Sequence, residues 1–121
     1  ILDTGSFDIL VSSERCADCR DPPYDANASS TFREAANASN LIVHTFGSGP
    51  TYSVRGYERV QVGPYAVENQ TFYQIVRHNI SAMNKSGSFN AIVGIGPQDG
   101  NSSAPSLLAS LGVSEFSICL K

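Results

Sequence analysis

The sequence predicts an all-β domain that carries one short helix. Apolar and polar residues alternate at period two, most clearly in residues 52–62, and short apolar runs are separated by Gly- and Pro-containing turns. Helical spacing of apolar residues is found only in residues 104–111. With 121 residues, 41% of them hydrophobic, the chain has the size of one domain with one core.

The first predicted hairpin surrounds a tight turn. Residues 39–45 contain a short apolar run, and residues 52–62 alternate between apolar and polar side chains. Residues 47–50 (Gly-Ser-Gly-Pro) supply glycines that reach positive φ and a proline that interrupts strand pairing. We therefore expect the two strands to pair across a turn at residues 47–50.

The remaining elements follow in order along the chain. Residues 69–77 alternate weakly and predict a strand, and residues 91–96 predict a buried strand that ends in glycines, where backbone approaches backbone. Residues 104–111 place three leucines on one stripe before Gly112, which predicts the helix and its end. Residues 116–120 predict a final strand.

Asp3 is the candidate catalytic residue. It follows an apolar pair and precedes Thr4, Gly5 and Ser6, so that its carboxylate can stand at a sharp loop. In such a loop the backbone N–H groups of Gly5 and Ser6 can donate hydrogen bonds to the carboxylate and hold it rigid. Asp-x-Gly is also ordinary turn chemistry, so the motif needs support from other segments.

The charges exclude some function classes. The formal net charge is −3 and the isoelectric point about 5.2, with charged residues scattered singly. No basic stripe is present, so no nucleic-acid partner is expected. No apolar run approaches the ~18 residues that a membrane span needs.

The cysteines predict a local disulfide between Cys16 and Cys19. No second Cys or His pair follows at ligand spacing, so a zinc site is disfavoured and no metal is expected. Cys119 is left over, and we expect it to bridge to a segment outside this chain.

The asparagines indicate a glycoprotein of the secretory pathway, either secreted or in an endolysosomal or vacuolar compartment. Six of the eight asparagines lie in Asn-x-Ser/Thr acceptor motifs: Asn27, Asn37, Asn69, Asn79, Asn84 and Asn101. A disulfide agrees with that compartment.

Five segments, in order, resemble the N-terminal lobe of a pepsin-like aspartic endopeptidase. Residues 1–6 (Ile-Leu-Asp-Thr-Gly-Ser) resemble the first active-site motif of that family. Residues 24–32 resemble its aromatic–acid segment that leads to Ser-Ser-Thr-aromatic, and residues 46–60 resemble its flap hairpin with the return strand. Residues 89–96 resemble the stretch that braces the active-site loop, and residues 116–120 the strand that closes the first lobe.

The resemblance implies one lobe of a bilobal enzyme. Residues 1–121 would then form the N-terminal lobe, without its upstream strands and without the whole C-terminal lobe, which supplies the second aspartate. Aspartic proteases are the standard case of two carboxylates that share one proton and activate water, with no metal or other cofactor. The expected function is acid endopeptidase action on protein or peptide substrates, between apolar residues.

The resemblance also assigns the site residues. Asp3 is the catalytic carboxylate, the hydroxyls of Thr4 and Ser6 orient it and its neighbours, and Gly5 gives access. The flap comprises Phe46, Gly47, Ser48 and Gly49. The apolar substrate pocket is lined by Ile1, Phe46, Phe89 and Ile92.

Two departures from the family pattern leave alternatives open. Phe46 stands where the family has a flap tyrosine, and Leu10 where it has the tryptophan that this tyrosine bonds. Because both residues are replaced, no buried polar group is left without a hydrogen-bond partner, and the replacement predicts an apolar flap. A second Asp-Thr/Ser-Gly motif is absent from the 121 residues, so the alternatives are a catalytically inactive pepsin-like binding protein and a single-lobe protease that pairs two Asp3 residues as a homodimer.

Overall fold

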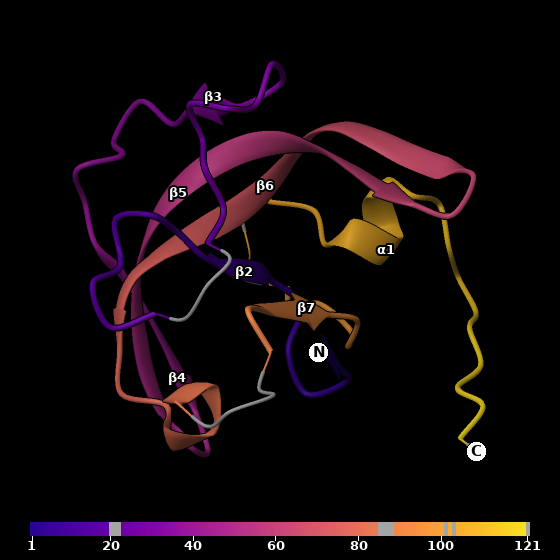
Figure 1. Cartoon of the computed structure of the whole chain (residues 1–121). Coiled ribbons are helices and arrows are strands. Elements are labelled where there is room, and N and C mark those ends of the chain that lie inside the picture. Colours follow the sequence, from indigo (N-terminus) through magenta and orange to yellow (C-terminus); the bar gives the residue numbers. More distant parts are fainter. Residues whose placement is uncertain (20–22, 85–88, 101, 103, 121) are drawn as a thin grey trace.

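A computed structural model describes residues 1–19, 23–84, 89–100, 102 and 104–120. In these residues seven strands form one mixed sheet, shown in Figure 1. The strands are β1 (Leu2–Asp3), β2 (Ile9–Ser12), β3 (Arg33–Glu34), β4 (Ile42–Phe46), β5 (Gly49–Val62), β6 (Tyr65–His78) and β7 (Ala91–Gly94). Their order is β1-β7-β2-β6-β5-β3, and β4 also pairs with β5. The all-β prediction is confirmed.

The first hairpin is confirmed, with a shorter turn than expected. Strands β4 and β5 are antiparallel, and Phe46 pairs directly with Gly49. The turn is therefore Gly47-Ser48 alone, and the expected turn residues Gly49 and Pro50 belong to β5. Pro50 is tolerated there because it lies near the start of the strand, where a missing N–H costs little pairing.

Strands β5 and β6 form a hairpin much longer than the predicted strands 52–62 and 69–77. Each has 14 residues, and they join at Gly63, which has a φ of +58°. The register shifts between Glu58 and Val60, and Asn69 on the opposite strand has a φ of +54°. This irregularity breaks the period-two alternation at Asn69, which explains why the predicted second strand began at residue 69 and not at Tyr65.

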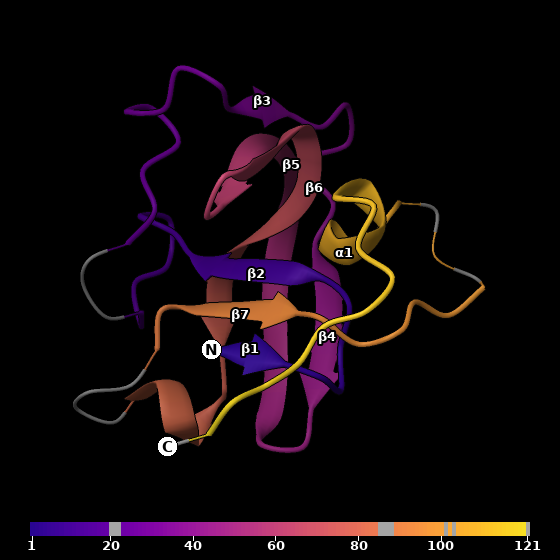
Figure 2. The same ribbon diagram turned by 90° about the vertical axis from the view of Figure 1, so that its right-hand side faces the viewer.

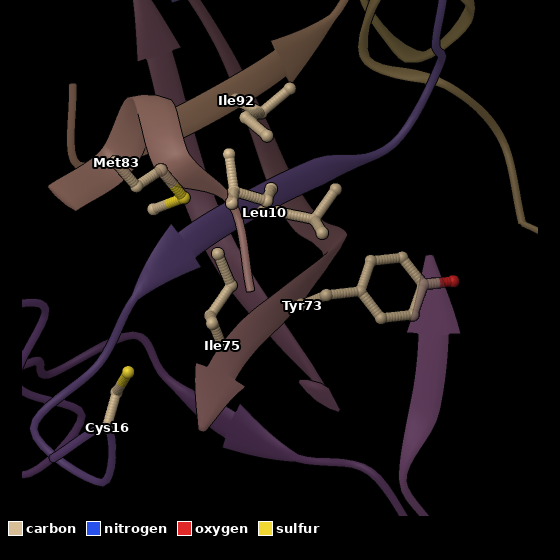
Figure 3. Close-up of a cluster of buried hydrophobic side chains, with 7 residues drawn as sticks. Leu10, Cys16, Tyr73, Ile75, Met83 and Ile92 are labelled. Carbon is tan, nitrogen blue, oxygen red and sulfur yellow. The ribbon is translucent and has the colours of Figure 1, made fainter. Parts of the chain in front are cut away.

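The sequence pattern missed β2, which is the strand at the centre of the molecule. It runs parallel to β6 and antiparallel to β7, and Leu10 within it is fully buried. Figure 2 shows β2, β7 and β1 side by side, and Figure 3 shows the Leu10 side chain among Ile75, Met83 and Ile92. A buried strand of four residues is too short to show a period by itself.

The helices and the C-terminal segment differ from the prediction in three ways. The helix α1 covers only Leu107–Ser110, capped by Ser106, inside the predicted range 104–111; a short 3₁₀ helix, η1 (Ser81–Asn84), was not predicted. The predicted strand at residues 116–120 is wrong, because this segment runs as an irregular trace in Figure 2 with Leu120 89% exposed. A strand needs a neighbour to satisfy its backbone N–H and C=O groups, and the segment pairs with none in the described residues.

A partly buried hydrogen-bond network ties the segment before β3 to the long hairpin. The Glu58 carboxylate accepts hydrogen bonds from the hydroxyls of Tyr24 (2.5 Å), Ser29 (2.6 Å) and Thr31, and from the backbone N–H of Arg59 (2.7 Å). Burial raises the pKa of Glu58, but these hydrogen bonds outweigh burial, so the pKa lies below its ordinary value of 4.5.

The lowered pKa of Glu58 predicts a stability that depends on pH. The contribution of the charged carboxylate is fully present above about pH 4.5 and is lost as the pH falls through the lowered value. We expect Glu58→Gln to lower the melting temperature of the full-length protein at pH 7 by several degrees, and the difference from wild type to narrow below pH 4. Glu68→Gln, which removes a more exposed carboxylate from the same hairpin, is the control with little effect. A difference that stays constant from pH 7 to pH 3 would contradict the assignment.

Candidate active site

The Asp3 carboxylate is held by its own loop. Asp3 ends β1, and the backbone N–H of Gly5 donates to Oδ1 at 3.0 Å. The Ser6 hydroxyl donates to Oδ2 at 2.6 Å. The expected donation from Gly5 is confirmed, whereas Ser6 contributes its hydroxyl and not its backbone N–H. Both carboxylate oxygens are therefore fixed in direction while Asp3 stays partly exposed.

Strand β7 and the residues just after it support the loop of residues 3–8, the catalytic loop, along its whole length. The backbone N–H of Ile95 donates to the Asp3 carbonyl, that of Gly96 to the Ser6 carbonyl, and that of Gly94 to the Asp8 carbonyl, each at 2.8 Å. The loop thus has three anchors along its length. This arrangement agrees with the expected role of residues 89–96 as a brace.

Residues 94 and 96 of the brace must be glycines, because the neighbouring backbone leaves no space for a Cβ atom. A Cβ atom on Gly94 would lie 2.5 Å from the Phe7 nitrogen and 2.6 Å from the Asp8 nitrogen. A Cβ atom on Gly96 would meet the carbonyl oxygen of Thr4. Backbone therefore packs directly on backbone under the catalytic loop, and Thr4 takes part through its carbonyl; the hydroxyl role expected for Thr4 stays a prediction.

A small apolar pocket of about 130 Å³ lies beside Asp3. It is lined by Ile1, Asp3, Phe46, Ser48, Ile80, Phe89 and Ile92. The structure thus brings together all four residues that the resemblance assigned to a substrate pocket, together with the candidate catalytic residue. Ile80 was missed, because no local pattern connects a residue just after β6 with the loop of Asp3.

The flap residues fall into two groups. Phe46 and Ser48 line the pocket, whereas Gly47 and Gly49 do not. Gly49 directly follows the turn and begins β5: its φ is +136°, and a Cβ atom there would collide with the carbonyl of Asn79. Phe46 packs against the core cluster that contains the buried Leu10, so the flap contact is apolar in this protein.

The predicted disulfide is confirmed. Cys16 and Cys19 are bonded with an S–S distance of 1.98 Å, and Cys119 is exposed and unpaired. The His78 ring lies near the bonded sulfurs, with the three potential ligand atoms within 4.8 Å of one another. Sulfurs joined in a disulfide are not the thiolates that a zinc site needs.

The fold and the site together define one lobe of an aspartic protease. A family comparison agrees: the model described as "Eukaryotic aspartyl protease" matches residues 1–111. The chain belongs to this family.

Individual relatives point the same way. The chain is 35% identical over 95 residues to "Plasmepsin IX" of Plasmodium falciparum, which covers 76% of this chain and 15% of the relative. It is 31% identical over 103 residues to "Procardosin-B" of Cynara cardunculus, covering 82% and 20%, and 30% identical over 99 residues to "Vacuolar protease A" of Arthroderma otae, covering 79% and 24%. The chain therefore spans between 15% and 24% of the length of these relatives.

Proposed function

We propose that this chain is the N-terminal lobe of an acid endopeptidase, to which it supplies one of two catalytic aspartates. The observation that carries the proposal is the Asp3 carboxylate, fixed by Gly5 and Ser6 at the edge of an apolar pocket. The test is cleavage of an unfolded protein at acid pH by the full-length protein and by its Asp3→Asn variant.

The chemistry requires a second carboxylate from the C-terminal lobe. The pair shares one proton, holds a water molecule, accepts one proton from it, and donates the shared proton to the peptide carbonyl oxygen as the water oxygen bonds to the carbonyl carbon. Gly5 and Ser6 keep Asp3 oriented, so that little of this geometry must be arranged during the reaction. Asp3 acts directly, while Ser6 acts through Asp3.

The pocket suggests the substrate. Apart from Asp3 and Ser48, every side chain that lines it is aliphatic or aromatic. A peptide that reaches Asp3 would therefore place an apolar side chain in the pocket, where it loses contact with water. We propose protein or peptide substrates that are cut next to an apolar residue.

A location in the secretory pathway fits the surface of the chain. Of the six acceptor asparagines, Asn27, Asn37, Asn69 and Asn79 are exposed, whereas the Asn84 side chain and Asn101 lie outside the described residues. One relative is named a vacuolar protease. In the described part of the chain, no helix has the length and apolar character to cross a membrane. We propose a glycosylated protein that is secreted or vacuolar.

The apolar flap yields a prediction about Phe46. We expect Phe46→Ala in the full-length protein to lower kcat/KM about tenfold or more, because the ring lines the pocket and shields it from water. Phe46→Tyr is expected to be nearly neutral, since Leu10 offers the added hydroxyl no partner. Steady-state kinetics on a peptide with an apolar residue at the cleavage site measures both. Wild-type activity of Phe46→Ala would contradict the role of the flap.

A further inference from the structure

The first strand of the flap hairpin has one free edge. In the described residues β4 pairs with β5 and with no other strand, while β5 is paired along most of its length with β6. The tip of the hairpin, Gly47-Ser48, extends beyond the paired region. Pairing with β5 holds one edge of β4. The other edge has no such support, so its position depends on contacts with other segments, among them the catalytic loop.

One face of β4 points toward that loop. Ile42, His44 and Phe46 are half-buried, whereas Val43 and Thr45 between them are exposed. Side chains two residues apart in a strand lie on the same face. A contact that fixes His44 therefore also fixes the orientation of Phe46 over the pocket.

Such a contact is present between His44 and Asp8. The His44 Nε2 atom lies 3.1 Å from Asp8 Oδ2, and the two side chains are only 17% and 21% exposed. When Nε2 carries a hydrogen, the imidazole donates and the Asp8 carboxylate oxygen accepts. Both residues line a second pocket of about 290 Å³ between the catalytic loop and β4, which also has Phe46 in its wall.

Both partners of this hydrogen bond are themselves held in place. The Asp8 carbonyl accepts the backbone N–H of Gly94 at 2.8 Å, so Asp8 belongs to the braced loop of Asp3. The His44 ring meets the ring of Tyr73 on β6 edge to face, with 4.6 Å between the centroids. The other ring nitrogen of His44, Nδ1, is buried and has no hydrogen-bond partner in the described residues, so Asp8 is the polar anchor of this side chain.

We propose that Asp8 and His44 are positioning residues for the active site. Their hydrogen bond fastens the free edge of the flap hairpin to the loop that carries Asp3, and so sets the place of Phe46 relative to the carboxylate. The consequence for catalysis rests on the proposed protease function. Neither residue touches the reacting atoms; each acts through Phe46 and the pocket that it closes.

The test uses the full-length protein and matched substitutions. His44→Phe keeps a ring against Tyr73 but removes the donor, and Asp8→Ala removes the acceptor. We expect each to lower kcat/KM about tenfold, and the double variant to lose no more than either single variant, because both remove the same contact. Asp8→Asn, which keeps a side-chain oxygen acceptor, is expected to stay within about threefold of wild type.

Hydrogen exchange provides a measurement that needs no activity. We expect residues 42–50 to exchange faster in His44→Phe than in wild type, and residues 65–78 to be unchanged. Glu68→Gln, which removes the carboxylate charge from the distant ion pair with Arg59, is the control and leaves both measurements as in wild type.

Three results would overturn the proposal: wild-type kcat/KM in both single variants, losses that multiply in the double variant, or faster exchange throughout residues 65–78, which would indicate general loosening of the domain. Failure of the protease function gives a different result. In that case the wild-type protein does not cleave, or Asp3→Asn still cleaves, while hydrogen exchange still reports on the Asp8–His44 contact.

Discussion

The full-length protein with Asp3→Asn is expected to fold normally and to lose cleavage by a factor of at least about 10²–10⁴, the usual contribution of a positioned acid–base group. The amide has the shape of the carboxylate, and its oxygen can still accept the N–H of Gly5. Its nitrogen can donate to the Ser6 hydroxyl oxygen, so the loop keeps its hydrogen bonds. The amide cannot take a proton from water, and the dyad therefore cannot work.

The measurement is cleavage of an unfolded protein between about pH 3 and pH 5, where a coupled carboxylate pair holds one proton. A peptide inhibitor that carries a hydroxyl in place of the scissile carbonyl should block wild-type cleavage, whereas a chelator should not. Residues 1–121 alone should be inactive at every pH, because one carboxylate cannot both activate water and protonate the carbonyl. Cleavage by Asp3→Asn, or loss of wild-type cleavage with a chelator, would contradict the mechanism.

These assays also separate the alternatives. A protein that folds, binds the inhibitor and cleaves nothing would be the inactive binding protein. Activity of residues 1–121 alone that rises with the square of the protein concentration would indicate the homodimer, in which two Asp3 residues meet.

The largest expected effect on stability comes from Gly94→Ala. The added methyl group would lie 2.5 Å from the Phe7 nitrogen and 2.6 Å from the Asp8 nitrogen, and both contacts are with backbone that cannot swing away. Either β7 or the catalytic loop must shift, which breaks the hydrogen bond from Gly94 to the Asp8 carbonyl. We expect a loss of about 3 kcal/mol or more in the free energy of unfolding, together with loss of cleavage.

Denaturant unfolding of the full-length protein measures this loss. Gly100→Ala is the matched control, because a Cβ atom there meets nothing within 4 Å and its φ is not in the left-handed region. The two variants add the same methyl group and differ only in its surroundings. A Gly94→Ala protein as stable as the Gly100→Ala protein would show that the loop does not rest on β7 as described.

The sequence by itself determined the family, the candidate catalytic residue and most of the pocket. This was possible because Asp3, the flap and residues 89–96 each belong to a short motif of adjacent residues, which can be recognised without knowing the fold. The resemblance to the pepsin-like family assigned Ile1, Phe46, Phe89 and Ile92 to one substrate pocket, and the structure brings them together there. The Cys16–Cys19 disulfide was predictable for the same reason, since only two residues separate its ends.

Only the tertiary structure decided the remaining features, since each depends on residues far apart in the sequence. β2 is a strand because β6 and β7 flank it, and residues 116–120 are not a strand because the described chain gives them no neighbour. The Asp8–His44 hydrogen bond joins positions 36 residues apart, and Ile80 reaches the pocket from the end of β6. Local sequence carries turn chemistry and strand periodicity, but it does not specify which distant backbone supplies a hydrogen-bond partner or which distant side chain fills a space.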